Sequence, residues 1–581
     1  MKVYAKKNFF LMSFIIVAIA FYCLSSLGSY GFCSSEKTIS NPIQVFLGAL
    51  TQTEPSSLTV YPWQPFSREK VLPLTPTSHF PPGNHIVVKG CRGEYEPGSF
   101  IIHANKDLED ITLVVSELKK SSGATIPSDA VDLRLVKCWF QGGEGTIRMT
   151  KKKVLTPELL LRDDSLVRVD SSSGINYLRV TVSGHERYVD ISSENGAPPP
   201  LSLFDDAPSL LPFSLPANNN KQVWVTVRIP QEAQTGMYRG KFDLMVGGKS
   251  VTTIGLDVEV LPFDLIPPML DYGLYYRGVL TQKMVTNISS EGKNSAQYRA
   301  ELQNMYEHGV QYPTLFQHVQ DDSLNKALTI RDQYPFRKDR LFTLGTTTAN
   351  KTDNEGLQQL DSRLSVWELK AAEHGYHSVY IYGIDEAVGD RLNAQRVSWN
   401  VVHQRGMKVF VAVYEGAVGL IGDTLDQPIL SGYKPQEVKL WHNQGKRVYC
   451  YGNPQVGVED PRVYRENYGY RLWLGGYDGC MLYAYQHGFG EIWNDFDSPE
   501  FRDHVFAYPT RTGVIDTVQW EGFREGIDDI RYLSTILAAP GVSTSSINNE
   551  LSARLAVQGG EMTAIRSWLI EQMAPRNTES R

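Results

Sequence analysis

Residues 377–387, in the second half of the chain, read HSVYIYGIDEA. The run from Val379 to Tyr382 is apolar and aromatic, which is typical of a buried strand in a parallel sheet. Two adjacent carboxylates, Asp385 and Glu386, follow it almost directly. Like charges repel, so beside an apolar strand end they indicate either an exposed turn or a site of chemistry. The neighbouring sequence is needed to choose between these interpretations.

A short apolar strand followed by a helix recurs throughout the second half of the chain. Helical segments such as 295–309 and 357–375 end in a glycine suited to a helix C-cap. Eight such units predict a (β/α)8 TIM-type barrel over residues 269–540, with Asp385 and Glu386 at the carboxyl end of its fourth strand, where barrel enzymes place their active sites. The predicted strands are 272–278, 310–317, 340–345, 377–384, 408–416, 427–433, 447–453 and 479–486.

Residues 58–268 have a different pattern. Runs such as HIVVKGCRGEYEPGSFIIHA and KQVWVTVRIP are rich in β-branched and aromatic residues and are separated by Gly, Pro and polar turns. They predict an N-terminal antiparallel β-sandwich. The proline-rich stretch LPFDLIPPML marks the boundary with the barrel, and residues 541–581 are predicted to form a C-terminal helical segment.

The first 34 residues form a separate unit. Three lysines precede the apolar run FFLMSFIIVAIAFYCLSSL, and small residues follow it. This pattern is that of a signal peptide or an N-terminal membrane anchor, so we expect an extracytoplasmic protein with membrane attachment as one alternative. The net charge of -7 and the lack of a basic block argue against a nucleic-acid partner.

The sequence contains no CxxC, GxGxxG, P-loop or HExxH motif, so we expect neither a cofactor nor a metal. Among the six cysteines, Cys450 and Cys480 fall in neighbouring predicted strands, which permits a disulfide without requiring one. Trp and Tyr are plentiful, and their flat faces can fill cores or stack on sugar rings.

A glycosidase usually needs two carboxylates on opposite faces of the sugar. The predicted seventh strand ends in Tyr451-Gly452-Asn453-Pro454, without a carboxylate. The alternative is substrate assistance, in which the 2-acetamido group of an N-acetylhexosamine attacks its own anomeric carbon. An adjacent pair suits that mechanism: Asp385 would orient the acetamido group, while Glu386 would serve as acid and then as base.

The segments YIYGIDEA, GYDGCMLYAYQHGFGEIWNDFD and YPTRTGVIDTVQWEGFREGIDDIRYL resemble the catalytic barrel of glycoside hydrolase family 123. Upstream, CRGEYEPGSF and KQVWVTVRIPQEAQTGMYRGKFDL are similar to the β-sandwich that precedes that barrel, and the resemblance extends from about residue 60 to 540. It implies a retaining enzyme that acts on β-N-acetylgalactosaminides by substrate assistance. It also implies the orienting role for Asp385 and the acid/base role for Glu386.

Other polar and aromatic residues at strand ends are candidates for substrate binding, each with a structural alternative. The turn after the eighth strand could bind a sugar. Alternatively, it could be a capped turn over a core tryptophan. Strand tyrosines could contact the acetamido group or pack in the barrel, and an arginine could reach substrate or form a surface ion pair. The candidates are Arg277, Tyr382, Glu415, Tyr451, Trp493, Asn494 and Asp495.

Two further functions fit the same fold. Glu386 could pair with Glu415 or Asp495 on a sugar that has no acetamido group. Alternatively, the chain could be a surface protein that binds glycans without cleaving them. All three hypotheses expect a glycan or glycoconjugate partner, and none of them fixes the sugar linkage or the oligomeric state.

Overall fold

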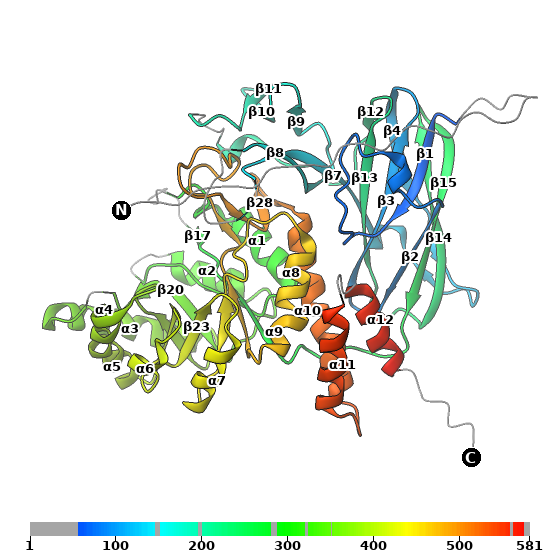
Figure 1. Ribbon diagram of the computed structural model, residues 1–581. Coiled ribbons are helices and arrows are strands. Elements are labelled where there is room, and N and C mark those ends of the chain that lie inside the picture. Colours follow the sequence, from blue (N-terminus) through cyan, green and yellow to red (C-terminus); the bar gives the residue numbers. More distant parts are fainter. Residues whose placement is uncertain are drawn as a thin grey trace, which may run out of the picture. The chain divides into compact units, whose positions relative to one another are not determined.

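A computed structural model describes residues 56–143, 145, 152–195, 200–280, 288–319, 323–349, 351–557 and 562–573 (Figure 1). The predicted signal peptide or anchor at 1–34 lies outside these residues. None of the helices within the described ranges has the length and apolar character that crossing a membrane requires.

Two facing sheets form the N-terminal sandwich. The first has the order β1 (Leu58–Trp63), β3 (Tyr95–Ala104), β13 (Asn220–Arg228), β7 (Val131–Gln141), β8 (Val154–Leu161). The second has the order β12 (Phe213–Leu215), β4 (Leu108–Val115), β14 (Gly236–Val246), β15 (Lys249–Val260), β2 (His85–Gly90). In addition, β5 (Leu118–Lys119) pairs with β14, and β6 (Thr125–Ile126) pairs with β5. The sheets share one apolar core, in which the rings of Phe100 and Phe242 lie 5.5 Å apart. The prediction of antiparallel pairing is correct except at β15 and β2, which run parallel.

The predicted barrel is confirmed, and every predicted strand position contains a strand. The strands are β16 (Asp271–Leu274), β19 (Tyr312–Pro313), β20 (Leu341–Thr347), β21 (Val379–Tyr382), β22 (Lys408–Val413), β23 (Gln427–Ser431), β24 (Tyr449–Tyr451) and β25 (Gly479–Leu482). All neighbours in the sheet are parallel, and a bridge between Leu315 and Thr343 closes it between the second and third strands. The barrel interior is filled mainly by aromatic side chains, including Phe342, Phe410 and Tyr449.

Helices follow each barrel strand and surround the barrel (Figure 1). They are α1 (Ser295–Glu307), α2 (Ser323–Arg331), α3 (Asn354–Glu373), α4 (Gly389–Ala394), α5 (Arg396–Gln404), α6 (Val418–Ile421), α7 (Pro435–Asn443), α8 (Pro461–Tyr468), α9 (Tyr470–Leu474) and α10 (Val518–Leu537). Two more helices, α11 (Thr544–Ala556) and α12 (Met562–Met573), occupy the C-terminal segment.

The chain between β25 and α10 forms two small ribbons, β26 (Gln486–His487) with β27 (His504–Val505) and β28 (Ala507–Pro509) with β29 (Val514–Asp516). This segment packs on an extension of the sandwich made of β9 (Val167–Asp170), β10 (Ile175–Val182) and β11 (His185–Asp190), with which it shares an apolar core. Short elements complete the described fold: η1 (Thr77–His79), η2 (Ser128–Ala130), η3 (Leu201–Leu203), β17 (Val279–Leu280) and β18 (Gly292–Lys293).

A buried group of charges joins the sandwich, the barrel and α12. Asp529 on α10 accepts hydrogen bonds from the Nε atoms of Arg465 (2.8 Å) and Arg566 (2.6 Å). Arg566, on α12, also lies 3.3 Å from a carboxylate oxygen of Glu96 on β3. We call the following set the Arg566 cluster: Glu94, Glu96, Arg465, Glu525, Asp528, Asp529, Arg531 and Arg566.

The four cysteines in the described ranges are free thiols. Cys450 and Cys480 face each other on β24 and β25 without forming a disulfide, so the buried-thiol alternative is the one the structure contains.

Candidate active site

Asp385 and Glu386 stand at the carboxyl end of β21, between β20 and β22. The chain leaves the strand through Gly383, where a Cβ atom would lie only 2.9 Å from the Cβ of Val411. Glycine therefore lets the chain turn close against β22. Asp385 is exposed and Glu386 is half-buried, so both carboxylates remain accessible at the mouth of the barrel.

The backbone of Glu386 is held in an unusual conformation. Its φ angle is +50°, in the left-handed region that residues other than glycine seldom adopt. Its N–H donates a 3.1 Å hydrogen bond to the carbonyl of Ala412 on β22, which helps to fix this turn. Such a conformation costs about 1–3 kcal/mol, and such conformations cluster at functional sites. The strain therefore points to a role for the Glu386 side chain.

A chain of two tyrosines supports Asp385. Tyr275 donates a 3.3 Å hydrogen bond to the hydroxyl of Tyr382, which in turn donates a 2.6 Å hydrogen bond to Oδ1 of Asp385. Burial, together with nearby negative charge, raises the pKa of both tyrosines well above the ordinary value. Both therefore keep their protons, and Tyr382 acts as a fixed donor that orients the Asp385 carboxylate. Tyr382 was predicted from sequence as a site residue, whereas Tyr275 was not.

Glu386 has its own tyrosine donor. The hydroxyl of Tyr414, the first residue after β22, donates a hydrogen bond to Oε2 of Glu386. The pKa of Tyr414 is raised to about 12, mainly because of this hydrogen bond. The Tyr414 side chain is 42% exposed, so it lies where a substrate could reach it. Sequence reasoning missed Tyr414 and named its neighbour Glu415 instead.

Further aromatic residues lie beside the dyad. The ring of Tyr483, just after β25, is 5.5 Å from that of Tyr275, and its hydroxyl contacts Nδ1 of His487. Burial and the charge of Arg277 lower the pKa of His487 to about 4, so its imidazole is neutral at pH 7. Arg277, a predicted site residue, forms a 2.7 Å hydrogen bond to Glu291 and lies over the ring of Phe316.

Two predicted residues lie at strand ends without touching Asp385 or Glu386. Tyr451, the last residue of β24, faces the barrel interior, and its buried hydroxyl has no hydrogen-bond partner among the described residues. Glu415 is exposed and lies 3.2 Å from the ammonium group of Lys434. Tyr451 therefore keeps a free donor for a ligand, whereas Glu415 sits in a surface ion pair.

The structure does not bring Trp493, Asn494 or Asp495 to the dyad. Trp493 is buried against the rings of Trp139, Phe204 and Tyr508 and donates a hydrogen bond to a backbone carbonyl. Asn494 donates to the carbonyl of Ser193, and Asp495 accepts from the N–H of Gly142 and from Arg502. These contacts fit the structural alternative, a capped turn over a core tryptophan, in which the turn holds the segment after β25 against the sandwich extension.

Two buried sets of side chains within the described ranges have the spacing of metal ligands. One consists of His308, Asp516 and Glu521, and the other of Glu94, Glu96 and Asp528. Arginines already pair with carboxylates in both sets, including Arg134 with Asp516 and Arg566 with Glu96. Neither set includes Asp385 or Glu386.

No protein-family model matches the sequence, and no curated protein matches it. Among solved structures, a family 123 glycoside hydrolase from Clostridium perfringens, studied for glycolipid glycan hydrolysis, has a TM-score of 0.62 at 11% sequence identity. The match covers 88% of this chain and 97% of that enzyme, so the two share their fold over nearly their whole length. A GH5 xyloglucanase from Bacteroides ovatus (9% identity, 81% and 100% covered) and a xylanase from Cellvibrio japonicus (11%, 75% and 92%) reach TM-scores of only 0.28 and 0.30.

Proposed function

We propose that the protein is a retaining glycoside hydrolase that removes β-linked N-acetylhexosamine, with N-acetylgalactosamine as the preferred sugar. The observation that carries this proposal is the pair Asp385 and Glu386 at the carboxyl end of the fourth barrel strand, each with its own tyrosine donor. The fold shared with a family 123 glycoside hydrolase, and the sequence resemblance to that family, support the choice of reaction.

In this mechanism the carbonyl oxygen of the substrate's acetamido group attacks the anomeric carbon, and the bond to the leaving oxygen breaks. Asp385, fixed by Tyr382, accepts a hydrogen bond from the acetamido N–H and stabilises the positive charge that develops on the ring formed. Glu386 gives its proton to the leaving oxygen. It then takes a proton from the water that opens the cyclic intermediate, so the anomeric configuration is retained.

We also propose that the protein acts outside the cytoplasm, because residues 1–34 have the pattern of a signal peptide or anchor. A glycan or glycoconjugate substrate at the cell surface or in the surroundings is consistent with such export.

The test uses matched aryl β-glycosides of N-acetylgalactosamine, N-acetylglucosamine and galactose with the wild-type protein and with Asp385→Asn. We expect cleavage of acetamido sugars only, with the N-acetylgalactosaminide fastest, and a loss of that activity in Asp385→Asn. Cleavage of the galactoside at an equal or higher rate would overturn substrate assistance and favour a second carboxylate such as Glu415. Binding without cleavage of any of the three would favour the glycan-binding alternative.

A further inference from the structure

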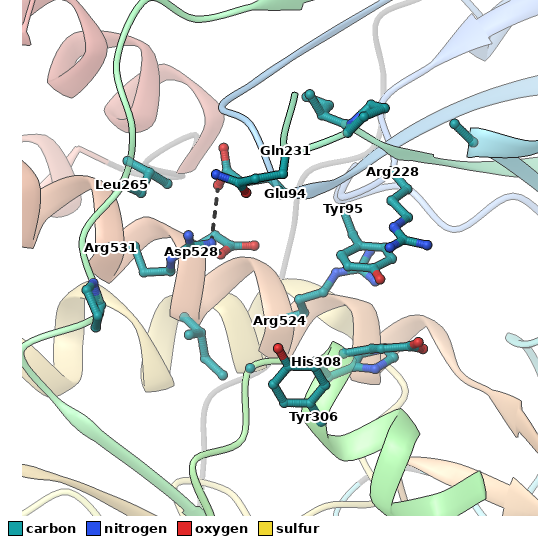
Figure 2. Close-up of a pocket in the computed structure, with 18 of the residues that line it drawn as sticks. Glu94, Tyr95, Arg228, Gln231, Leu265, Tyr306, His308, Arg524, Asp528 and Arg531 are labelled. Carbon is teal, nitrogen blue, oxygen red and sulfur yellow. Dashed lines mark hydrogen bonds and ion pairs between the residues drawn. The ribbon is translucent and has the colours of Figure 1, made fainter. Parts of the chain in front are cut away.

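A cavity that is not lined by the dyad lies where the sandwich meets the barrel (Figure 2). Its volume is about 830 Å³, within the range of about 300–1,000 Å³ that small-molecule sites occupy. The start of β3 and the loops at 127–130 and 228–232 line it from the sandwich, and the end of α1 and one face of α10 line it from the barrel. None of its lining residues belongs to the dyad or to the tyrosines around it.

Two tyrosine rings line this cavity. Tyr306 at the end of α1 is 43% exposed, although its ring also packs against Phe336 at 6.2 Å. Tyr95 at the start of β3 lies between two guanidinium groups, that of Arg228 at 5.9 Å and that of Arg524 at 5.6 Å. Figure 2 shows both rings at the cavity. Neither hydroxyl makes a hydrogen bond within the described part of the chain, so both are available to a ligand.

The rim carries donors and acceptors that lack hydrogen-bond partners. Arg228 and Gln231 can donate, and Asp129 and Glu232 can accept, yet none of these four side chains forms a hydrogen bond or ion pair with another described residue. Glu307, which accepts one hydrogen bond from Gln303, adds a further acceptor, and its charge acts on the hydroxyl of Tyr95. The cavity therefore presents donors and acceptors with unused bonding capacity beside the exposed ring of Tyr306.

This combination of lining side chains favours one class of ligand. An anion would meet five carboxylates, and a cation would meet the guanidinium groups of Arg228, Arg524 and Arg531. A sugar hydroxyl both donates and accepts, and the C–H face of a sugar ring packs on an aromatic ring. We propose that this cavity is a second, non-catalytic saccharide-binding site, in which the exposed ring of Tyr306 provides a stacking face and Arg228 binds hydroxyl groups. The choice of sugar rests on the proposed function, whereas the choice of a polyhydroxyl ligand rests on the lining groups.

The test is titration calorimetry on the full chain carrying Glu386→Gln, so that the ligand is not consumed. The probe is a trisaccharide that ends in β-linked N-acetylgalactosamine. We expect two binding events per chain. Adding Tyr306→Ala and Arg228→Ala should leave one, whereas Arg239→Ala, which removes an exposed arginine elsewhere on the sandwich, should leave both. No event, a single event that persists in the Tyr306→Ala and Arg228→Ala variant, or two events that persist in that variant would overturn the proposal.

A separate assay distinguishes failure of this site from failure of the proposed function. Tyr306→Ala with Arg228→Ala should leave cleavage of a small aryl N-acetylgalactosaminide by the otherwise wild-type protein unchanged, because both residues lie outside the dyad. If the wild type cleaves no acetamido sugar but the trisaccharide still binds through Tyr306 and Arg228, the proposed function fails and the second site stands. If cleavage is normal but no binding depends on Tyr306, the second site fails and the proposed function stands.

Discussion

Carboxylates gather in two regions of the molecule, and their partners differ. At the mouth of the barrel, Asp385 and Glu386 accept hydrogen bonds from the neutral hydroxyls of Tyr382 and Tyr414 and stay accessible. In the Arg566 cluster the carboxylates are buried, and Asp529 is held by two guanidinium groups.

The difference shows what each region is suited to do. A buried carboxylate that is held by two arginines, as Asp529 is, has its charge compensated and its oxygens occupied, so it stabilises one arrangement of the sandwich, barrel and α12. A carboxylate that is fixed by one phenol keeps free lone pairs, so it can exchange a proton or accept a hydrogen bond from a substrate. We therefore expect substitutions at the mouth to change activity and those in the Arg566 cluster to change stability.

The largest expected effect is that of Glu386→Gln. Loss of general acid–base catalysis should lower kcat on a natural glycoside by about 100- to 10,000-fold, with little change in the temperature of unfolding. Aryl glycosides with good leaving groups need less protonation and should lose less. Rates measured across a series of leaving groups test this, and an equal loss on every substrate would exclude the acid role.

Arg566→Ala should lower the stability of the protein and leave its activity per folded molecule nearly unchanged. It leaves Glu96 without its guanidinium partner and leaves Asp529 and Glu525 with Arg465 alone, and breaking a buried pair in this way typically costs about 3–5 kcal/mol. Denaturant unfolding should show this loss, while activity per folded molecule stays near that of the wild type. Arg471→Ala is the matched control, because its exposed pair with Glu466 should contribute at most about 1 kcal/mol. Equal losses in the two variants would remove the distinction between the regions.

Tyr382→Phe removes the donor that orients Asp385. A hydrogen bond to a charged group contributes about 1.5–3 kcal/mol, which corresponds to a loss of about 10- to 100-fold in kcat/KM. The loss should be larger for an acetamido substrate than for any slow reaction on a sugar without that group. Steady-state kinetics on both substrates measures this, and unchanged kinetics would show that Tyr382 serves packing alone.

The smallest expected effect is a change in how the stability of the protein depends on pH. Burial and the neighbouring Asp528 charge raise the pKa of Glu94 to about 7, above its ordinary value of 4.5. The folded protein therefore holds this proton more tightly than the unfolded chain, so stability from this group falls as pH rises through 4.5 to 7. Glu94→Gln should flatten that fall. The difference in unfolding temperature between the two proteins, followed from pH 5 to 8, reports Glu94 together with Glu96, whose pKa the Glu94 charge helps to raise, because groups of opposite sign such as His487 are common to both. A constant difference would contradict this account.

The alternation of strand and helix predicted the barrel because each unit is local in sequence. Every predicted strand contains a strand of the structure, and Asp385 and Glu386 stand at the predicted end of the fourth. The contact of Tyr382 with Asp385 is equally local, since the two residues are three positions apart.

The remaining parts of the site depend on long-range contacts. Trp493 follows the eighth strand closely, yet it is buried against Trp139, which lies over 350 positions earlier in the chain. Tyr414 contacts Glu386 because the turn after β22 directs it there, whereas Glu415 is directed to Lys434. A one-residue difference at a strand end reverses which side chain faces the site, and the sequence pattern alone does not resolve that difference.

Substrate assistance at Asp385 and Glu386 requires a cyclic intermediate. A thiazoline analogue of the intermediate that N-acetylgalactosamine would form should therefore inhibit the enzyme. Transition-state and intermediate analogues bind far more tightly than substrates, by about 10²-fold or more. We predict competitive inhibition at concentrations at least about 100-fold below KM for the aryl N-acetylgalactosaminide, with weaker binding in Asp385→Asn. Cleavage of that substrate with no effect of the thiazoline would contradict the account.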